Sequence, residues 1–125
     1  MAHWSDHYIG IPHVELDCAE LVGKVLREQL GREVHFPRKQ EDGLDHRSGL
    51  IVANAKDYAR KIDAPHDGCG VLMFFRGRRA HMGLYALIDG QGYVLHSDAL
   101  FGSSVRMQLE RVRKVYKVEG FYDWL

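Results

Sequence analysis

The apolar residues of this 125-residue chain change their spacing once, and this change constrains the fold more than any other feature. Before Pro65 they recur at intervals of three and four residues, which is the period of an amphipathic helix. After Gly70 they form short runs or alternate with polar residues, which is typical of strands. Helices first and strands afterwards predict an α+β domain, with the N-terminal helices packed on one face of an antiparallel sheet.

Two helices are predicted in the first part of the chain. The first covers Cys18–Leu30, with Asp17 as its N-cap and Gly31 at its C-terminus. The second runs from Ser48 to Ile62 and ends before the next proline. Residues 32–47 mix charged residues with Pro and Gly and show no period, so they are predicted to form a surface loop.

Five strands are predicted in the second part. They cover Val71–Phe75, Ala80–Ile88, Tyr93–His96, Val105–Leu109 and Val112–Val118. The segment Asp89–Gly92 is a tight connection and predicts a hairpin between the second and third of these strands. Because no repeat, linker or low-complexity tract divides the chain, residues 1–125 are predicted to form one domain.

Composition excludes several classes of protein. Two cysteines are too few for a disulfide scaffold, and 17 basic against 17 acidic residues argue against a nucleic-acid-binding protein. The longest apolar run, Val71 to Phe75, is far short of the ~20 residues that span a bilayer. Residues 1–7 contain Asp6 and two His where a signal peptide would be basic and then apolar, so we expect cytoplasmic synthesis.

Cys18 is a candidate nucleophile because of its place on the first predicted helix. At the first turn of a helix, unpaired backbone N–H groups and the helix dipole favour a thiolate. The same N–H groups can donate hydrogen bonds to an oxyanion. The alternative is a buried core thiol, since Cys18 shares an apolar stripe with Leu21 and Val25.

His81 and His96 are candidates for the base that a thiolate nucleophile needs. Pairing about the centre of the turn near residue 90 places the partner of His81 near position 99, so both His lie at the same end of the hairpin. Gly83 would allow a neighbouring backbone or a substrate to approach this strand closely. The alternative for each His is an ordinary strand-end residue that binds backbone or water.

Four segments in this order resemble the NlpC-type cell-wall cysteine peptidases, a papain-like family. They are Asp17–Val22, Val71–Phe75, His81–Tyr85 and Val94–Ser97. The resemblance extends from about Tyr8 to Phe121 and is strongest to the short versions coded in phage tail-assembly modules. It implies a papain-like NlpC-type fold, and each motif is weak by itself.

The resemblance also implies a reaction. Cys18 would be the nucleophile, His81 the base and His96 the residue that orients His81, while Tyr8 would help to polarise the scissile carbonyl. The substrate would be the peptide stem of peptidoglycan, cut after D-γ-glutamate through an acyl-enzyme, with no cofactor. Phage tail proteins would be partners, and a virion would deliver the enzyme to the cell wall.

Two departures from the family pattern keep other functions open. Glu20 stands where the family has Gly, and Cys69-Gly70 stands where it has Gly-Asp. These departures allow a non-catalytic structural part of a phage tail with the same fold. A second alternative is a zinc-binding protein, because one Cys and two His are usual zinc ligands.

Overall fold

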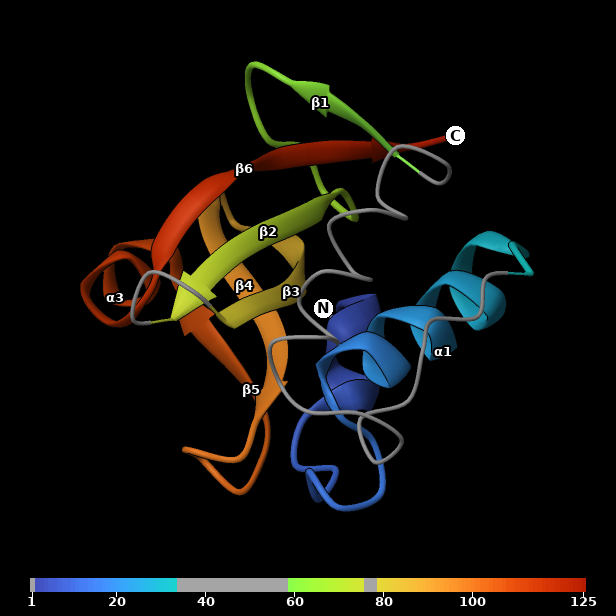
Figure 1. Ribbon diagram of the computed structural model, residues 1–125. Coiled ribbons are helices and arrows are strands. Elements are labelled where there is room, and N and C mark those ends of the chain that lie inside the picture. Colours follow the sequence, from blue (N-terminus) through green and yellow to red (C-terminus); the bar gives the residue numbers. More distant parts are fainter. Residues whose placement is uncertain (1, 34–58, 76–78) are drawn as a thin grey trace.

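The computed structural model describes residues 2–33, 59–75 and 79–125 of the chain (Figure 1). The first part holds the 3-10 helix η1 (Trp4–Tyr8) and the helix α1 (Cys18–Leu30). Then follow β1 (Ala59–Ile62), β2 (Gly70–Phe75), β3 (Arg79–Ile88), β4 (Gln91–Asp98), β5 (Ser103–Gln108), the helix α3 (Leu109–Val115) and β6 (Lys117–Trp124). The strands form one antiparallel sheet in the order β1-β6-β2-β3-β4-β5, which confirms the α+β class.

The first helix begins and ends where its sequence predicts. The Asp17 side chain accepts a hydrogen bond from the backbone N–H of Glu20 at 3.0 Å, and the Glu20 side chain accepts one from the N–H of Asp17 at 3.5 Å. This reciprocal pair is a capping box, so Glu20 has a structural reason to stand here. At the other end Gly31 has φ 64° and donates to the carbonyl of Leu26.

The predicted hairpin is confirmed as β3 and β4. Its turn consists of Asp89 and Gly90, with φ values of 52° and 77°, and Ile88 pairs directly with Gln91. Positive φ at both central residues is the type I′ arrangement that suits the twist of a hairpin. The other strands predicted before residue 109 are also present, as β2 and β5, with small differences at their ends.

Two predicted elements are wrong where the structure describes them. Ala59–Ile62 is a strand paired with β6 and not the end of a helix; residues 48–58 of that helix, and 34–47 of the predicted loop, lie outside the described residues. The predicted strand Val112–Val118 is instead the end of α3 and the start of β6. There the apolar residues also fit a helical period, which is the period that the chain adopts.

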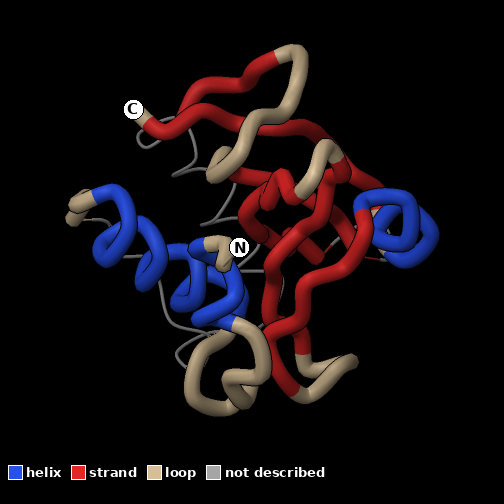
Figure 2. Tube along the Cα trace, turned by 180° about the vertical axis from the view of Figure 1, so that it is seen from behind, coloured by secondary structure: helices blue, strands red, loops and turns tan. Residues whose placement is uncertain are grey.

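The two described helices cover opposite faces of the sheet, as Figures 1 and 2 show. On one face α1 packs its apolar side against alternate residues of the strands, including Leu72, Met82 and Leu84. On the other face Val112 of α3 packs in a cluster with Tyr85 and other strand residues. The N-terminal helix α1 therefore lies on one face, and α3, which was not predicted, closes a second buried cluster on the other.

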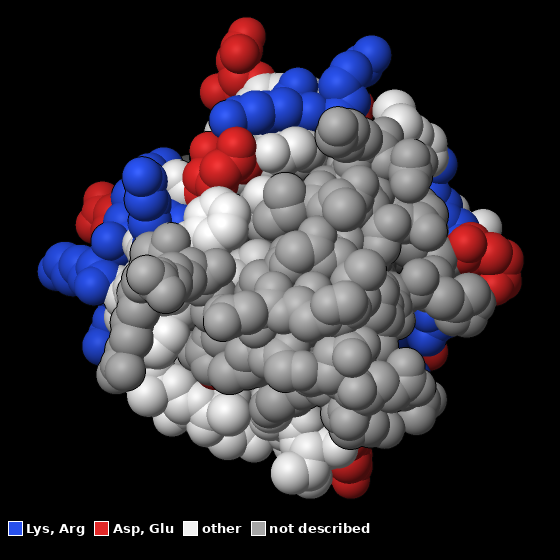
Figure 3. Space-filling view, viewed as in Figure 1, with Lys and Arg blue, Asp and Glu red and all other residues white. Residues whose placement is uncertain are grey.

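The described surface carries both signs of charge. On the face drawn in Figure 3, basic and acidic side chains occur next to one another, in keeping with a net charge of zero. Between the edge strand β1 and its neighbour β6, Lys61 Nζ lies 2.8 Å from a carboxylate oxygen of Glu119. In the part of the chain that the structure describes, no helix has the length and apolar character needed to cross a membrane.

Candidate active site

Two buried histidines meet where β3 and β4 stop pairing with each other. The backbone register between these strands runs from Ile88 and Gln91 to Leu84 and Leu95 and ends there. Beyond it, β3 continues along β2 and β4 continues along β5. Here His81 Nε2 lies 2.9 Å from His96 Nδ1, so an imidazole pair bridges the two strands. His81 is 5% exposed and His96 is fully buried.

Gly83 allows the two strands to come this close. A Cβ atom at this position would lie 2.7 Å from the carbonyl oxygen of Leu95 and 3.1 Å from His96 Cβ. Real Cβ atoms essentially never come as close as 2.7 Å to a backbone oxygen, so any larger residue would push the strands apart. The predicted close approach at Gly83 is confirmed, and the neighbouring backbone is that of β4.

Tyr116, directly after α3, holds the imidazole pair from the second face of the sheet. Its ring stacks on that of His81, with the centroids 5.1 Å apart and the planes 6° from parallel. It also meets the edge of His96 at 5.4 Å. The Tyr116 hydroxyl donates to the Asp98 carboxylate, and that carboxylate accepts a second hydrogen bond from the Leu100 backbone N–H at 3.2 Å. Both side chains are buried, which fixes the position of the stacked ring.

His96 is neutral at physiological pH. Burial, together with the nearby His81, lowers the pKa of His96 from 6.5 to about 3, while the charge of Asp98 acts in the opposite direction. Each of its ring nitrogens has a partner. Nδ1 faces His81, and Nε2 lies 3.3 Å from the Sδ atom of Met107 on β5. A neutral imidazole in this setting can hold the orientation of His81.

Cys18 is the first residue of α1, and α1 packs against β3 and β4. The side chain of Cys18 is 3% exposed and lies in the buried cluster on the α1 face, with Ala80 and Met82. His81, between these two strand residues, stacks on Tyr116 of the second cluster. The start of the helix is also tied to β4, because Ser97 Oγ donates a 2.8 Å hydrogen bond to the carbonyl of Leu16. The structure therefore anchors the nucleophile candidate to the same end of the hairpin as the imidazole pair.

Tyr8 lies elsewhere. Its hydroxyl donates to Glu28 Oε1 at 2.8 Å and accepts from Gln29 Nε2 at 3.1 Å, and burial raises its pKa. Glu28 follows Cys18 by ten residues on the same helix, which is about 15 Å along the axis. Because the structure puts the Tyr8 hydroxyl at the opposite end of α1, we leave it out of the reaction proposed below.

The second cysteine, Cys69, has a structural environment. It is fully buried in the cluster under α3, and burial raises the pKa of its thiol. A thiol with a raised pKa is a poor nucleophile at neutral pH. This agrees with a packing role for Cys69.

Several residues around the imidazole pair were not identified from the sequence. They are Ser97, Asp98, Met107 and Tyr116. Ser97 and Asp98 directly follow His96, so a run of polar residues at the end of a predicted strand was the available signal. Met107 and Tyr116 gave no signal, because apolar and aromatic residues are ordinary in predicted strands.

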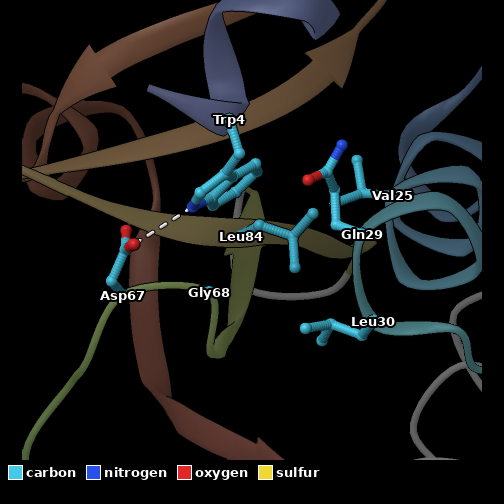
Figure 4. Close-up of a pocket in the computed structure, with 7 residues that line it drawn as sticks. All are labelled: Trp4, Val25, Gln29, Leu30, Asp67, Gly68 and Leu84. Carbon is cyan, nitrogen blue, oxygen red and sulfur yellow. Dashed lines mark hydrogen bonds between the residues drawn. The ribbon is translucent and has the colours of Figure 1, made fainter. Parts of the chain in front are cut away.

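A pocket of about 190 Å³ lies at the other end of α1, away from the imidazole pair (Figure 4). Apolar side chains of α1 and β3 line it together with Trp4 and Asp67, which are joined by a 3.1 Å hydrogen bond from the indole Nε1. The Asp67 carboxylate also accepts from the backbone N–H of Leu87 at 2.8 Å and contacts His3 Nε2 at 2.9 Å. These bonds hold η1 against the turn before β2, so Asp67 has a structural role.

The described residues contain no arrangement that supports the zinc-binding alternative. Within 2–33, 59–75 and 79–125, no three His, Cys, Asp or Glu side chains are grouped so that they could hold a metal ion.

Comparisons of the chain with protein-family models, with curated proteins and with solved structures find no match. The resemblance to the NlpC-type peptidases therefore stays a prediction that rests on the motifs.

Proposed function

We propose that this chain is a cysteine peptidase of the papain-like NlpC type that hydrolyses amide bonds in the peptide stems of peptidoglycan. The observation that carries the proposal is the buried His81–His96 hydrogen bond at the end of the hairpin to which the start of α1 is anchored. A nucleophile at a helix N-terminus, a base and a residue that orients the base are the parts that thiol catalysis needs.

Each residue has a role in the proposed reaction. His81 takes the proton of the Cys18 thiol, and the Sγ atom attacks the carbonyl carbon of the substrate amide. Backbone N–H groups at the start of α1 donate hydrogen bonds to the oxyanion. His81 then gives its proton to the leaving amine, the C–N bond breaks, and a thioester remains on Cys18. Water, with its proton taken by His81, hydrolyses the thioester and regenerates the thiol.

The substrate and the location follow from the resemblance. The proposed bond is the one after D-γ-glutamate in the stem peptide, and the proposed site of action is the bacterial cell wall. Delivery inside a phage virion, in contact with tail proteins, would bring the enzyme there after its synthesis in the cytoplasm. No cofactor takes part in the proposed mechanism.

The direct test is cleavage of purified muropeptides, followed by mass spectrometry. We expect wild type to release the products of amide hydrolysis and the Cys18→Ala variant to release none. Cys69→Ala is the matched control, because it removes the other buried thiol and is expected to keep the activity of wild type. Absence of cleavage by wild type at every pH between 5 and 9, or equal cleavage by Cys18→Ala, would show that the proposal is wrong.

The burial of Cys18 favours a second candidate, a non-catalytic component of a phage tail with the same fold. A thiol that only packs in a core reacts slowly with alkylating reagents. Iodoacetamide labelling of the native protein, read by peptide mass spectrometry, separates the two candidates. The peptidase proposal predicts that Cys18 is labelled well before Cys69, whereas the second candidate predicts slow labelling of both.

A further inference from the structure

We propose that Met107 sets the direction of the hydrogen bond between the two histidines, so that His81 is left with its basic nitrogen at Nδ1. The inference concerns the proton positions on the imidazole pair and deepens the proposed function, on which its catalytic consequence rests. It depends on the 3.3 Å contact between His96 Nε2 and Met107 Sδ and on the 2.9 Å contact between His96 Nδ1 and His81 Nε2.

A thioether has no proton to give, so Met107 can only accept a hydrogen bond. The nitrogen that faces it, Nε2 of His96, therefore carries a proton, because the opposite tautomer would direct a lone pair at the sulfur. A neutral imidazole has only one N–H group, so Nδ1 of His96 is then an acceptor.

The proton position on His96 determines the proton position on His81. With Nδ1 of His96 as the acceptor, Nε2 of His81 must donate the hydrogen bond between the rings. A neutral His81 with a proton on Nε2 has its lone pair on Nδ1. That is the nitrogen available to take a proton from a thiol. With the opposite direction of the bond, Nδ1 of His81 would carry a proton and could not act as a base.

The environment of the pair keeps the bond in this direction. Tyr116 stacks on the face of His81 and meets the edge of His96, so neither ring can turn over without displacing a buried aromatic side chain. Phe101 packs on His96 from another side, with the ring centroids 5.9 Å apart. Met107 is thus a positioning residue that acts through His96.

Proton positions can be measured directly in the whole protein. Long-range ¹H–¹⁵N correlation spectra of protein labelled with ¹⁵N-histidine separate the two neutral tautomers of each ring. For wild type at pH 7.5 we expect the Nε2–H tautomer on both His81 and His96. If His96 of wild type shows the Nδ1–H tautomer, the inference is wrong, and this result needs no variant.

The substitution Met107→Leu removes the sulfur acceptor and keeps a side chain of similar volume. In Met107→Leu we expect His96 to lose its single tautomer and His81 to gain the Nδ1–H form. On the muropeptide substrate we expect kcat to fall by about 10-fold, with KM little changed. The loss is smaller than the loss on removing a carboxylate that fixes a histidine tautomer, because a thioether is a weaker acceptor. Met107→Gln offers a carbonyl oxygen as acceptor and is expected to restore part of the loss.

Met73→Leu is the matched control. Met73 is buried in the cluster that Met107 packs against, and in the β2–β3 register it is opposite His81. We expect this variant to keep both wild-type tautomers and the wild-type kcat. Unchanged tautomers in Met107→Leu would overturn the inference even if the enzyme cleaves its substrate. A tautomer shift in a protein that cleaves nothing would support the inference and contradict the proposed function.

Discussion

The ring of Tyr116 lies flat on the ring of His81, with centroids 5.1 Å apart and planes 6° from parallel. The two residues come from different parts of the chain, and their contact joins the end of α3 to the first residues of β3. Through its hydroxyl, Tyr116 is bonded to the buried Asp98 carboxylate as well. One side chain thus contacts both the imidazole pair and the buried carboxylate.

The Tyr116 hydroxyl is expected to stabilise the fold. Tyr116→Phe keeps the stacked ring but removes a donor from a buried carboxylate, which should lower the free energy of unfolding by about 1–3 kcal/mol. Urea unfolding measures this loss. Tyr122→Phe is the control, because its hydroxyl bonds to the half-buried Glu119 at 2.6 Å, and a smaller loss is expected. Equal losses in the two variants would contradict a special role for the Asp98 bond.

Gly83 is expected to tolerate no side chain. In Gly83→Ala the new methyl group would meet the Leu95 carbonyl oxygen and the Val94 side chain at 2.7 and 2.8 Å, so the strands must separate. Overpacking of this kind costs about 1–3 kcal/mol, measured as a shift of the urea midpoint. In Gly120→Ala the nearest atom is Cε of Lys61, at the end of a flexible side chain that can move away, so that control should lose less.

Stability is expected to fall as the pH decreases, because of His96. Its pKa is about 3 in the folded protein and near 6.5 in the unfolded chain, so between these values only the unfolded chain binds the proton. The contribution of neutral His96 is therefore complete above pH 6.5 and is lost as the pH falls toward 3. From pH 7 to pH 5 the free energy of unfolding should decrease by about 2 kcal/mol for this one group.

Urea unfolding of wild type and His96→Asn at both pH values measures the contribution of His96 to the pH dependence of stability. Asn does not titrate in this range, so the variant should lose less stability between pH 7 and pH 5 than wild type loses. The same pH dependence in both proteins would contradict the assignment to His96.

The two histidines are expected to differ in their importance for activity. His81→Asn removes the group that transfers the proton, which should lower kcat by about 10²- to 10⁴-fold. His96→Asn should lose less, because an amide oxygen can still accept the hydrogen bond from His81 Nε2. Product formation from muropeptides measures both variants. Complete loss in both would contradict the separate roles of base and orienting residue.

Part of this fold could be predicted from the sequence because local signals agreed with the final structure. Asp17 and Gly31 define the ends of α1, and the Asp89-Gly90 turn defines the hairpin that brings His81 and His96 together. The capping box is also visible in the sequence, as Asp17 followed three residues later by Glu20.

The wrong predictions have a common physical cause. Ala59 and Ile62 fit a helical stripe, yet these residues form a strand because they pair with Trp124 and Phe121 of β6, far later in the chain. Val112 and Val118 fit an alternating strand, yet they belong to a helix and to the next strand. Short apolar segments fit either period, and tertiary pairing decides between them. The surroundings of the imidazole pair depend on the same distant pairing, so Met107 and Tyr116 could not be predicted.

The place of β6 in the sheet has a consequence for the order of folding. This strand comes last in the chain but lies between β1 and β2, and it pairs with both. The hairpin of β3 and β4 can form while the chain is still being synthesised, since its contacts are local. β1 cannot join the sheet until Lys117–Trp124 has left the ribosome, because β6 is the strand with which it pairs.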